Sequence, residues 1–211
     1  MQDAIRHAYE IVAKMSRHKK PYFIRMLGRR ILVLPGVFSP KYVSDVKWFA
    51  RKVPRIVGKR SFLEIGTGTG VITLFVALNG TKNIITTDIN AQAVKNARRT
   101  FRLHKLSIPV RVGNVFEPIK KQEKFNVIFW NHPFHYTKRA KNALEKGGYD
   151  YQYGSLRSFF RDAGNHLTAN GEVLLGTSKN ARLDVIRALG REYGYVQKLI
   201  KQAETPSEHR K

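Results

Sequence analysis

From residue 61 onward, short apolar runs alternate with longer segments whose apolar residues recur every three or four positions. The runs predict buried strands, and the longer segments predict amphipathic helices between or after them. The predicted strands lie near residues 61–65, 83–88, 109–112, 125–130 and 172–177, and the predicted helices near 70–79, 90–104, 155–168 and 181–190. This alternation is typical of an α/β fold with a doubly wound, mostly parallel, Rossmann-like sheet. We also expect a sixth strand at residues 193–200.

The first 60 residues follow a different pattern, which predicts a helix, a hairpin and a second helix. Residues 4–15 carry apolar side chains on one helical face. Two apolar stretches, 22–26 and 31–34, flank a Leu-Gly-Arg-Arg turn, as in a hairpin. Residues 39–54 begin with a Ser-Pro pair, typical of an N-cap and first helical position, and end at a proline.

We therefore divide the chain into three parts. Residues 1–60 form a basic N-terminal extension that packs on the core, and residues 61–200 form the core. The tail, residues 201–211, is too polar to be assigned an element.

The charge of the chain is strongly positive and unevenly placed. Lys and Arg number 39 against 15 Asp and Glu, a net charge of +24, and residues 1–60 contribute half of it. Such a field attracts polyanions, so RNA is the expected partner and the extension its expected binding face. Lys19, Lys20, Arg29 and Arg30 are the candidate phosphate contacts, because loops and turns face solvent. The alternative is a solvated basic surface or one that meets an anionic membrane.

Composition narrows the class of protein further. The chain has no run of 18 apolar residues and no apolar segment next to a small-residue cleavage site, so we expect neither a membrane span nor a secretory signal. It has no cysteine, which excludes disulfides and thiolate metal sites and is consistent with a reducing cytosol. We expect a cytoplasmic protein without a metal or membrane partner, and the sequence leaves its oligomeric state open.

A glycine-rich turn follows the first predicted strand of the core. Gly66, Gly68 and Gly70 let the backbone turn sharply and approach a ligand where the next helix presents unpaired N–H groups. Val71 stands where the dinucleotide pattern G-x-G-x-x-G requires its last glycine, and no Gly-Lys-Ser/Thr follows, so neither phosphate-binding pattern is met. A turn that only links strand to helix is the alternative, and Glu64 before the turn argues against it.

Asp88 stands at the end of the second predicted strand of the core. A carboxylate at this place can accept hydrogen bonds from both hydroxyls of a ribose. An acidic strand end is also a common helix N-cap, but Asn90 can take the cap here and leave Asp88 to a ligand. Together with the glycine-rich turn, Asp88 predicts a nucleoside-containing cofactor.

These residues resemble the class I S-adenosylmethionine-dependent methyltransferases. "LEIGTGTG" is similar to their first motif, "TTDIN" to the second and "VGNVFEPI" to the third, and the resemblance extends over residues 30–177. It implies S-adenosyl-L-methionine as the cofactor and a methyl transfer as the reaction.

The resemblance also implies a role for each motif position. Gly66, Thr67 and Gly68 would line the methionine part, Asp88 the ribose, Ile89 the adenine face, and Asn114 with Val115 the adenine edge. Glu64, Gly70 and Asn131 complete the expected cofactor set. The family usually has Asp where Asn114 stands, and an amide oxygen still accepts from the adenine amino group.

The sequence "NHPF" ends the strand predicted at 125–130, and it resembles the N-P-P-F/Y motif of methyltransferases that act on a nitrogen conjugated to a planar group. Asn131 and the carbonyl of His132 would each bind one N–H of the acceptor, and Phe134 after Pro133 would stack on its planar group. The reaction would then be an in-line transfer without a covalent intermediate. His132 replaces the first proline, and its imidazole has three alternatives: to take up the amine proton, to donate to a phosphate, or to pack.

A second stretch points to one group within the family. Residues 34–46, "LPGVFSPKYVSDV", are similar to the segment before the core of ribosomal RNA guanine-N2 methyltransferases, and "NHPFH" is closer to their motif than to that of release-factor glutamine methyltransferases. Phe38 and His135 join the candidate substrate residues on this basis. Larger members of that group carry a second domain ahead of the core, where this chain has some 60 residues.

Three functions stay open from the sequence. The first is an RNA base N-methyltransferase acting at guanine N2 or adenine N6. The second is a protein glutamine or small-molecule N-methyltransferase. The third is an RNA-binding protein that keeps the fold and has lost catalysis through His132.

Overall fold

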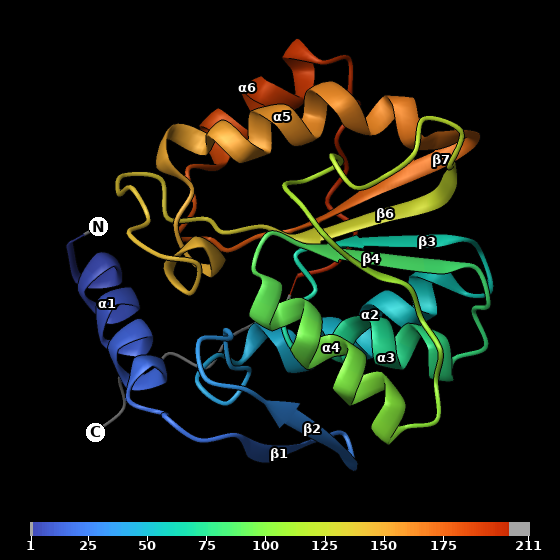
Figure 1. Ribbon diagram of the computed structural model, residues 1–211. Coiled ribbons are helices and arrows are strands. Elements are labelled where there is room, and N and C mark those ends of the chain that lie inside the picture. The colour runs from blue at the N-terminus through green and yellow to red at the C-terminus, as the bar shows by residue number, and fades with distance from the viewer. Residues whose placement is uncertain (1, 203–211) are drawn as a thin grey trace.

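The computed structural model describes residues 2–202 and shows a parallel sheet covered by helices on both faces (Figure 1). Its five strands lie in the order β5-β4-β3-β6-β7, and every neighbouring pair is parallel. The strands are β3 (Phe62–Ile65), β4 (Ile84–Asp88), β5 (Val110–Val112), β6 (Phe125–Asn131) and β7 (Leu167–Gly176). The expected doubly wound α/β fold is confirmed.

Helices lie on both faces of this sheet. In Figure 1, α2, α3 and α4 lie below it, and α5 and α6 lie above it. The helices are α1 (Gln2–Ser16), α2 (Asp45–Val57), α3 (Val71–Leu78), α4 (Ala91–Leu103), α5 (Gly154–Ala163) and α6 (Leu183–Glu192), with 3-10 turns η1 (Glu145–Gly147), η2 (Tyr151–Tyr153) and η3 (Gly164–His166). No helix among the described residues is both long and apolar enough to span a bilayer.

The apolar run of β6 is explained by burial on both faces. Val127 and Phe129 pack with α2 and α3 residues, while Ile128 and Trp130 pack on the α5 side, because successive strand side chains point to opposite faces. All four are at most 6% exposed. Phe159 of α5 lies 5.1 Å from the Trp130 ring, centroid to centroid. The strand that carries the NHPF sequence is therefore rigidly held.

The N-terminal extension has the predicted helix and hairpin. Helix α1 precedes the antiparallel strands β1 (Tyr22–Met26) and β2 (Arg29–Val33). The Leu34 N–H donates to Oδ1 of Asn96 in α4 at 2.7 Å, and Asn96 Nδ2 donates to the Leu32 carbonyl at 2.8 Å. These bonds hold the end of the hairpin against the core.

The second predicted helix has the wrong boundaries. The predicted start at Ser39 and Pro40 is wrong. The Ser39 hydroxyl accepts from the Lys41 N–H, which closes a single turn, and it also accepts from the Tyr22 hydroxyl. Helix α2 starts at Asp45, and it continues past Pro54 to Val57.

Tertiary packing explains why α2 passes its proline. Val53 and Val57 are at most 2% exposed, so the apolar face outweighs the backbone hydrogen bond that proline cannot make. Asn79, the C-cap residue after α3, also donates to the Pro54 carbonyl at 3.0 Å.

The sixth strand predicted at residues 193–200 is also wrong. The chain has a turn at Tyr193 and Gly194 and then no regular element. Val196 is fully exposed and Leu199 is 75% exposed, so their apolar spacing is not used in a sheet. Of the polar tail, residues 203–211 lie outside the described residues.

Substitution of a glycine can test how closely the loop between β3 and α3 packs on α4. Gly70 has a φ of +81°, and a Cβ there would lie 2.9 Å from the Phe101 ring and 3.2 Å from the Ala97 Cα. Gly28 has a similar φ of +80°, with nothing within 4 Å of its Cβ position. Gly28→Ala should cost about 1–2 kcal/mol from the left-handed backbone alone. Gly70→Ala should cost about 1–3 kcal/mol more, because the added methyl also overpacks. Urea unfolding of both variants measures the difference, and equal losses would contradict the close packing of this loop on α4.

Candidate active site at the carboxyl edge of the sheet

The predicted site residues meet at one edge of the sheet. In a parallel sheet the carboxyl ends of all strands share an edge, and ligands bind where the strand order reverses. Here the order reverses between β3 and β6. The turn that starts at Gly66 follows β3, and Asn131 ends β6, so the two lie on either side of the reversal.

Glu64 lies beneath the glycine-rich turn. Its carboxylate oxygen Oε2 accepts from the Thr67 hydroxyl at 2.8 Å and from the Thr73 hydroxyl at 2.5 Å. Burial raises the pKa of Glu64 to about 7, and the two hydroxyl bonds oppose that rise. Since the side chain is 2% exposed, it stabilises the turn from below, and its direct contact with a cofactor stays a prediction.

Asp88 connects two loops at the tip of β4. Its Oδ2 accepts from the Gly68 N–H and its Oδ1 from the Asn90 N–H, both at 2.8 Å. Burial raises the pKa of Asp88, while these two backbone bonds lower it. The predicted cap is confirmed, because Asn90 Oδ1 accepts from the Gln92 N–H at 2.9 Å. Asp88 also holds these two backbone groups, but each of its oxygens keeps a second lone pair for a hydroxyl, so its contact with a ribose stays a prediction.

Three further positions fit a nucleoside at this edge. A Cβ on Gly68 would meet nothing within 4 Å, so the turn borders open space. Ile89 follows Asp88 and leaves 39% of its apolar side chain exposed. Val115, beyond β5, has a φ of +45°, which is strained for a β-branched residue, and such strain clusters at functional sites. The neighbouring Asn114 is partly exposed, and its N–H donates to Glu117. The acceptor oxygens of Asp88, the exposed apolar surface of Ile89 and the open space at Gly68 are consistent with the cofactor that the motifs imply.

Asn131 has a partner that the sequence did not reveal. Its Nδ2 donates to Oδ2 of Asp45 at 3.1 Å, across 86 residues of sequence. Asp45 is the first residue of α2, five residues after the first helical position that the Ser-Pro pair predicts. The residue did fall within the segment "LPGVFSPKYVSDV", which was the one available signal.

His132 points into the protein. Its side chain is 1% exposed, and its ring packs edge-on against Tyr153 at 5.6 Å. The Pro133 carbonyl can only accept, so Nδ1 donates to it and Nε2 accepts from the Thr177 hydroxyl at 3.0 Å. Burial lowers the pKa of His132 to about 4. The buried ring favours packing over proton uptake or phosphate binding, and the role of His132 in catalysis stays a prediction.

The remaining motif residues lie together beside Asn131, in a surface that we call the wall and that includes Phe38, Phe134 and His135. The Tyr153 hydroxyl donates to the Phe134 carbonyl at 2.9 Å, and the His135 backbone pairs with Tyr149. Phe38 packs so closely on Gly147 that a Cβ there would lie 2.9 Å from its ring. The structure thus brings Phe38, Phe134 and His135 into the same region.

The wall continues into helix α1, which runs past residues 138–149 in Figure 1. Lys138 Nζ lies 3.7 Å from the centre of the Tyr9 ring and 4.6 Å from that of Tyr149. Arg139, which is exposed, stacks on Tyr151 at 4.3 Å. Cationic and aromatic groups therefore alternate along this wall.

The predicted RNA contacts of the extension are all exposed. Lys19 and Lys20 lie in the connection between α1 and β1, and Arg29 and Arg30 lie at the start of β2. The Arg30 guanidinium stacks 4.2 Å above the Phe23 ring, and the Arg30 carbonyl accepts from His104, the C-cap residue after α4, at 2.8 Å. These cations point to solvent and are not part of the edge that holds Asn131.

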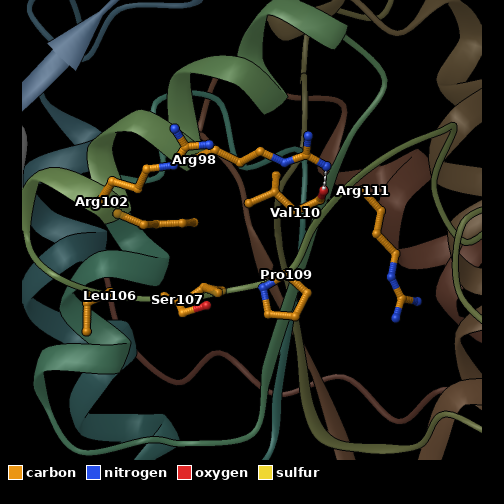
Figure 2. Close-up of a pocket in the computed structure, with 9 residues that line it drawn as sticks. Arg98, Arg102, Leu106, Ser107, Pro109, Val110 and Arg111 are labelled. Atoms are coloured by element: carbon orange, nitrogen blue, oxygen red, sulfur yellow. Dashed lines mark hydrogen bonds between the residues drawn. The ribbon is translucent and has the colours of Figure 1, made fainter.

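A separate basic groove lies between α4 and β5 (Figure 2). Its volume is about 480 Å³, and Arg98, Arg102 and Arg111 surround an apolar floor. Arg98 donates to the Val110 carbonyl at 2.6 Å, and Arg111 is paired with Glu123. The groove borders residues 106–109 before β5, so it lies toward the amino edge of the sheet rather than beside Asn131.

Comparison with known proteins places the chain in a family. The family model "Methyltransferase small domain" matches residues 28–205. A ribosomal RNA small subunit methyltransferase C of Mannheimia succiniciproducens is 31% identical over 73% of this chain and 43% of its own length. A putative protein N5-glutamine methyltransferase of Methanocaldococcus jannaschii is 28% identical over 88% of this chain and 94% of its own length.

Solved structures share the fold. The 16S rRNA N2 methyltransferase RsmC of T. thermophilus, in complex with AdoMet and guanosine, has a TM-score of 0.63 at 20% identity, over 82% of this chain and 45% of that one. SMU.776, described as a putative methyltransferase complexed with SAH, has a TM-score of 0.65 at 14% identity, over 90% of this chain and 51% of that one.

The chain thus spans less than half the length of the ribosomal RNA relatives, and nearly all of the glutamine methyltransferase relative. Since the family model covers most of the residues, the protein belongs to the methyltransferase small domain family, which has the class I S-adenosylmethionine-dependent methyltransferase fold.

Proposed function

We propose that the protein transfers a methyl group from S-adenosyl-L-methionine to the exocyclic amine of an RNA base, with guanine N2 as the leading acceptor. The observation that carries this proposal is the Asn131 amide at the end of β6, held by Asp45 across from the glycine-rich turn. An amide there is suited to a weakly nucleophilic planar nitrogen, which needs orientation more than activation.

The cofactor would be held by the tips of β3, β4 and β5. Gly66, Thr67 and Gly68 would line its methionine part, Asp88 would accept from its ribose, and Ile89 with Val115 would border the adenine. When bound, the cofactor supplies an electrophilic methyl group on a sulfonium. The Asp88 bonds to Gly68 and Asn90 support this role, because they fix the two loops before a ligand arrives.

The chain itself would orient the acceptor. The Asn131 amide oxygen and the His132 carbonyl would each accept one N–H, which directs the nitrogen lone pair toward the methyl group. Phe134 would pack on the planar ring and exclude water. The buried ring of His132 supports this division of roles, because packing against Tyr153 keeps the backbone of the motif in place.

RNA is favoured as the acceptor by charge and by the wall beside Phe134. The net charge is +24, and pairs such as Arg139 stacked on Tyr151 combine a cation suited to phosphate with an aromatic ring suited to bases. The name of the ribosomal RNA relatives points the same way. A cytoplasmic location for the enzyme would follow from a ribosomal RNA acceptor.

A protein glutamine acceptor is the second candidate. It is supported by the relative from M. jannaschii, whose length this chain nearly matches. A glutamine amide is also a planar nitrogen with two N–H groups, so the same Asn131 geometry fits it.

Transfer of tritiated methyl groups from S-adenosylmethionine separates the candidates. Total RNA and total protein from cells that lack this gene serve as acceptors, and we expect label in RNA, recovered as a methylated base after digestion. Label in protein as methylglutamine would favour the second candidate. Cofactor binding without transfer to either would favour an RNA-binding protein that has lost catalysis.

Asp88→Ala should weaken cofactor binding at least tenfold, because it removes charge-assisted bonds to the ribose, each worth about 1.5–3 kcal/mol. Asp162→Ala is the matched control, since Asp162 lies away from the strand tips and is paired with its neighbour Arg161. Titration calorimetry gives the affinities, and thermal melts establish that both variants fold. Equal affinity of the wild type and Asp88→Ala would contradict the ribose assignment.

Reversing the four exposed cations of the extension tests the RNA face. Their replacement by Glu should weaken RNA binding and flatten its salt dependence by up to about 0.7–0.9 in log–log slope for each phosphate contact removed. The changes are Lys19→Glu, Lys20→Glu, Arg29→Glu and Arg30→Glu. Cofactor affinity should not change, because these side chains lie outside the carboxyl edge.

The control carries the same change of charge elsewhere on the exposed surface. It combines Lys120→Glu, Lys121→Glu, Arg187→Glu and Lys198→Glu. Filter binding at several salt concentrations compares the two variants. If both variants lower the log–log slope of RNA binding against salt equally, the effect comes from net charge. The extension would then not be a specific RNA-binding face.

A further inference from the structure

We infer that Asp45 is a positioning residue for methyl transfer, because it determines which end of the Asn131 amide faces the acceptor. The inference rests on the proposed N-methyl transfer, but it does not depend on whether the acceptor is RNA or protein. Nothing in the N-P-P-F/Y resemblance assigns a residue of the N-terminal extension to this task.

The two bonds of the Asp45 carboxylate define its place. Oδ1 accepts from the Val46 N–H at 2.8 Å, at the start of α2, and Oδ2 accepts from Asn131 Nδ2 at 3.1 Å. Because one oxygen is held by the helix backbone, the other is aimed at β6. A carboxylate only accepts, so the amide must turn its NH₂ toward Asp45 and its oxygen away.

The absence of a side chain at Gly176 leaves space for the Asn131 amide oxygen. Gly176, the last residue of β7, lies beside Asn131 in the sheet. A Cβ on Gly176 would come within 3.0 Å of Asn131 Oδ1 and within 2.7 Å of the Phe49 ring. Asn131 itself is partly exposed.

This orientation matters because the two ends of an amide have opposite chemistry. The acceptor amine presents N–H donors and needs an oxygen opposite them. An amide without a fixed partner can turn its NH₂ toward the amine, which places donor against donor. The negative charge of Asp45 also draws the NH₂ group and increases the electron density on the amide oxygen.

The segment that carries Asp45 is itself bonded to the core and to the hairpin of the extension. Asn90 Nδ2 donates to the Gly36 carbonyl at 2.8 Å, and the Tyr22 hydroxyl donates to Ser39 at 2.7 Å. Residues 36–45 thus connect the β4 tip, where the cofactor would lie, to Asn131, where the acceptor would lie. The extension contributes to the reacting centre through this connection.

An exchange of the two side chains tests the inference. Asp45→Asn keeps the bond to the Val46 N–H through its oxygen, but it turns an NH₂ toward Asn131 and so reverses that amide. Asn131→Asp places two carboxylates against each other. We expect each single variant to lower kcat about tenfold or more. The double variant restores a donor facing an acceptor, with an oxygen toward the amine. Its kcat should be about tenfold higher than that of the less active single variant.

Ser44→Ala is the control for damage to the helix start, because Ser44 is exposed and its side chain makes no capping bond. It should keep the wild-type kcat. The probe is an unmethylated transcript of small-subunit ribosomal RNA, or the protein fraction if the wild type labels protein instead. The KM for S-adenosylmethionine should stay within about twofold in all variants, since the change affects orientation rather than cofactor binding.

A second readout needs no acceptor. In nitrogen-15 NMR spectra, the Asn131 side-chain protons should exchange with water faster in Asp45→Ala than in the wild type, while other asparagines keep their rates. Unchanged exchange, or a double variant whose loss is the product of the two single losses, would overturn the inference. A wild type that methylates neither RNA nor protein would instead overturn the proposed function.

Discussion

The carboxylate of Asp88 is the interaction on which the carboxyl edge of the sheet depends. It accepts one N–H from the turn after β3 and one from the start of α4, and so joins two loops that border the proposed cofactor site. Glu64 supports the same turn from below through Thr67 and Thr73. Both carboxylates are buried at a cost in solvation, which these hydrogen bonds offset. The open space above Gly68 therefore has a fixed border before any ligand binds.

A second constraint acts at the neighbouring strand. The Asn131 amide is held by Asp45, and the NHPF backbone is held by the buried ring of His132 between Thr177 and Tyr153. The proline that the motif usually has would stiffen the chain through its ring, whereas here packing does so. The replacement thus changes how the motif is held and leaves its two proposed acceptors in place, which favours an active enzyme.

Much of the fold could be predicted, because burial on both faces of β6 produces an apolar run and the glycine pattern marks the turn after β3. The errors have physical causes. Val53 and Val57 carry α2 past a proline by tertiary packing, and the Ser39 hydroxyl serves a local turn, so the helix starts five residues later than the Ser-Pro pair indicates. The Asp45 bond to Asn131 spans 86 residues, and no local pattern could show it.

The most direct test of the account is where S-adenosylhomocysteine binds. In nitrogen-15 NMR spectra of the full chain, its addition should shift the backbone amides of Gly68, Ile89 and Val115, three positions on separate strand tips. The amides of Leu106 and Ser107, which border the arginine groove in Figure 2, should not move. Shifts confined to the groove, or none at saturating ligand, would contradict a cofactor site at the carboxyl edge of the sheet.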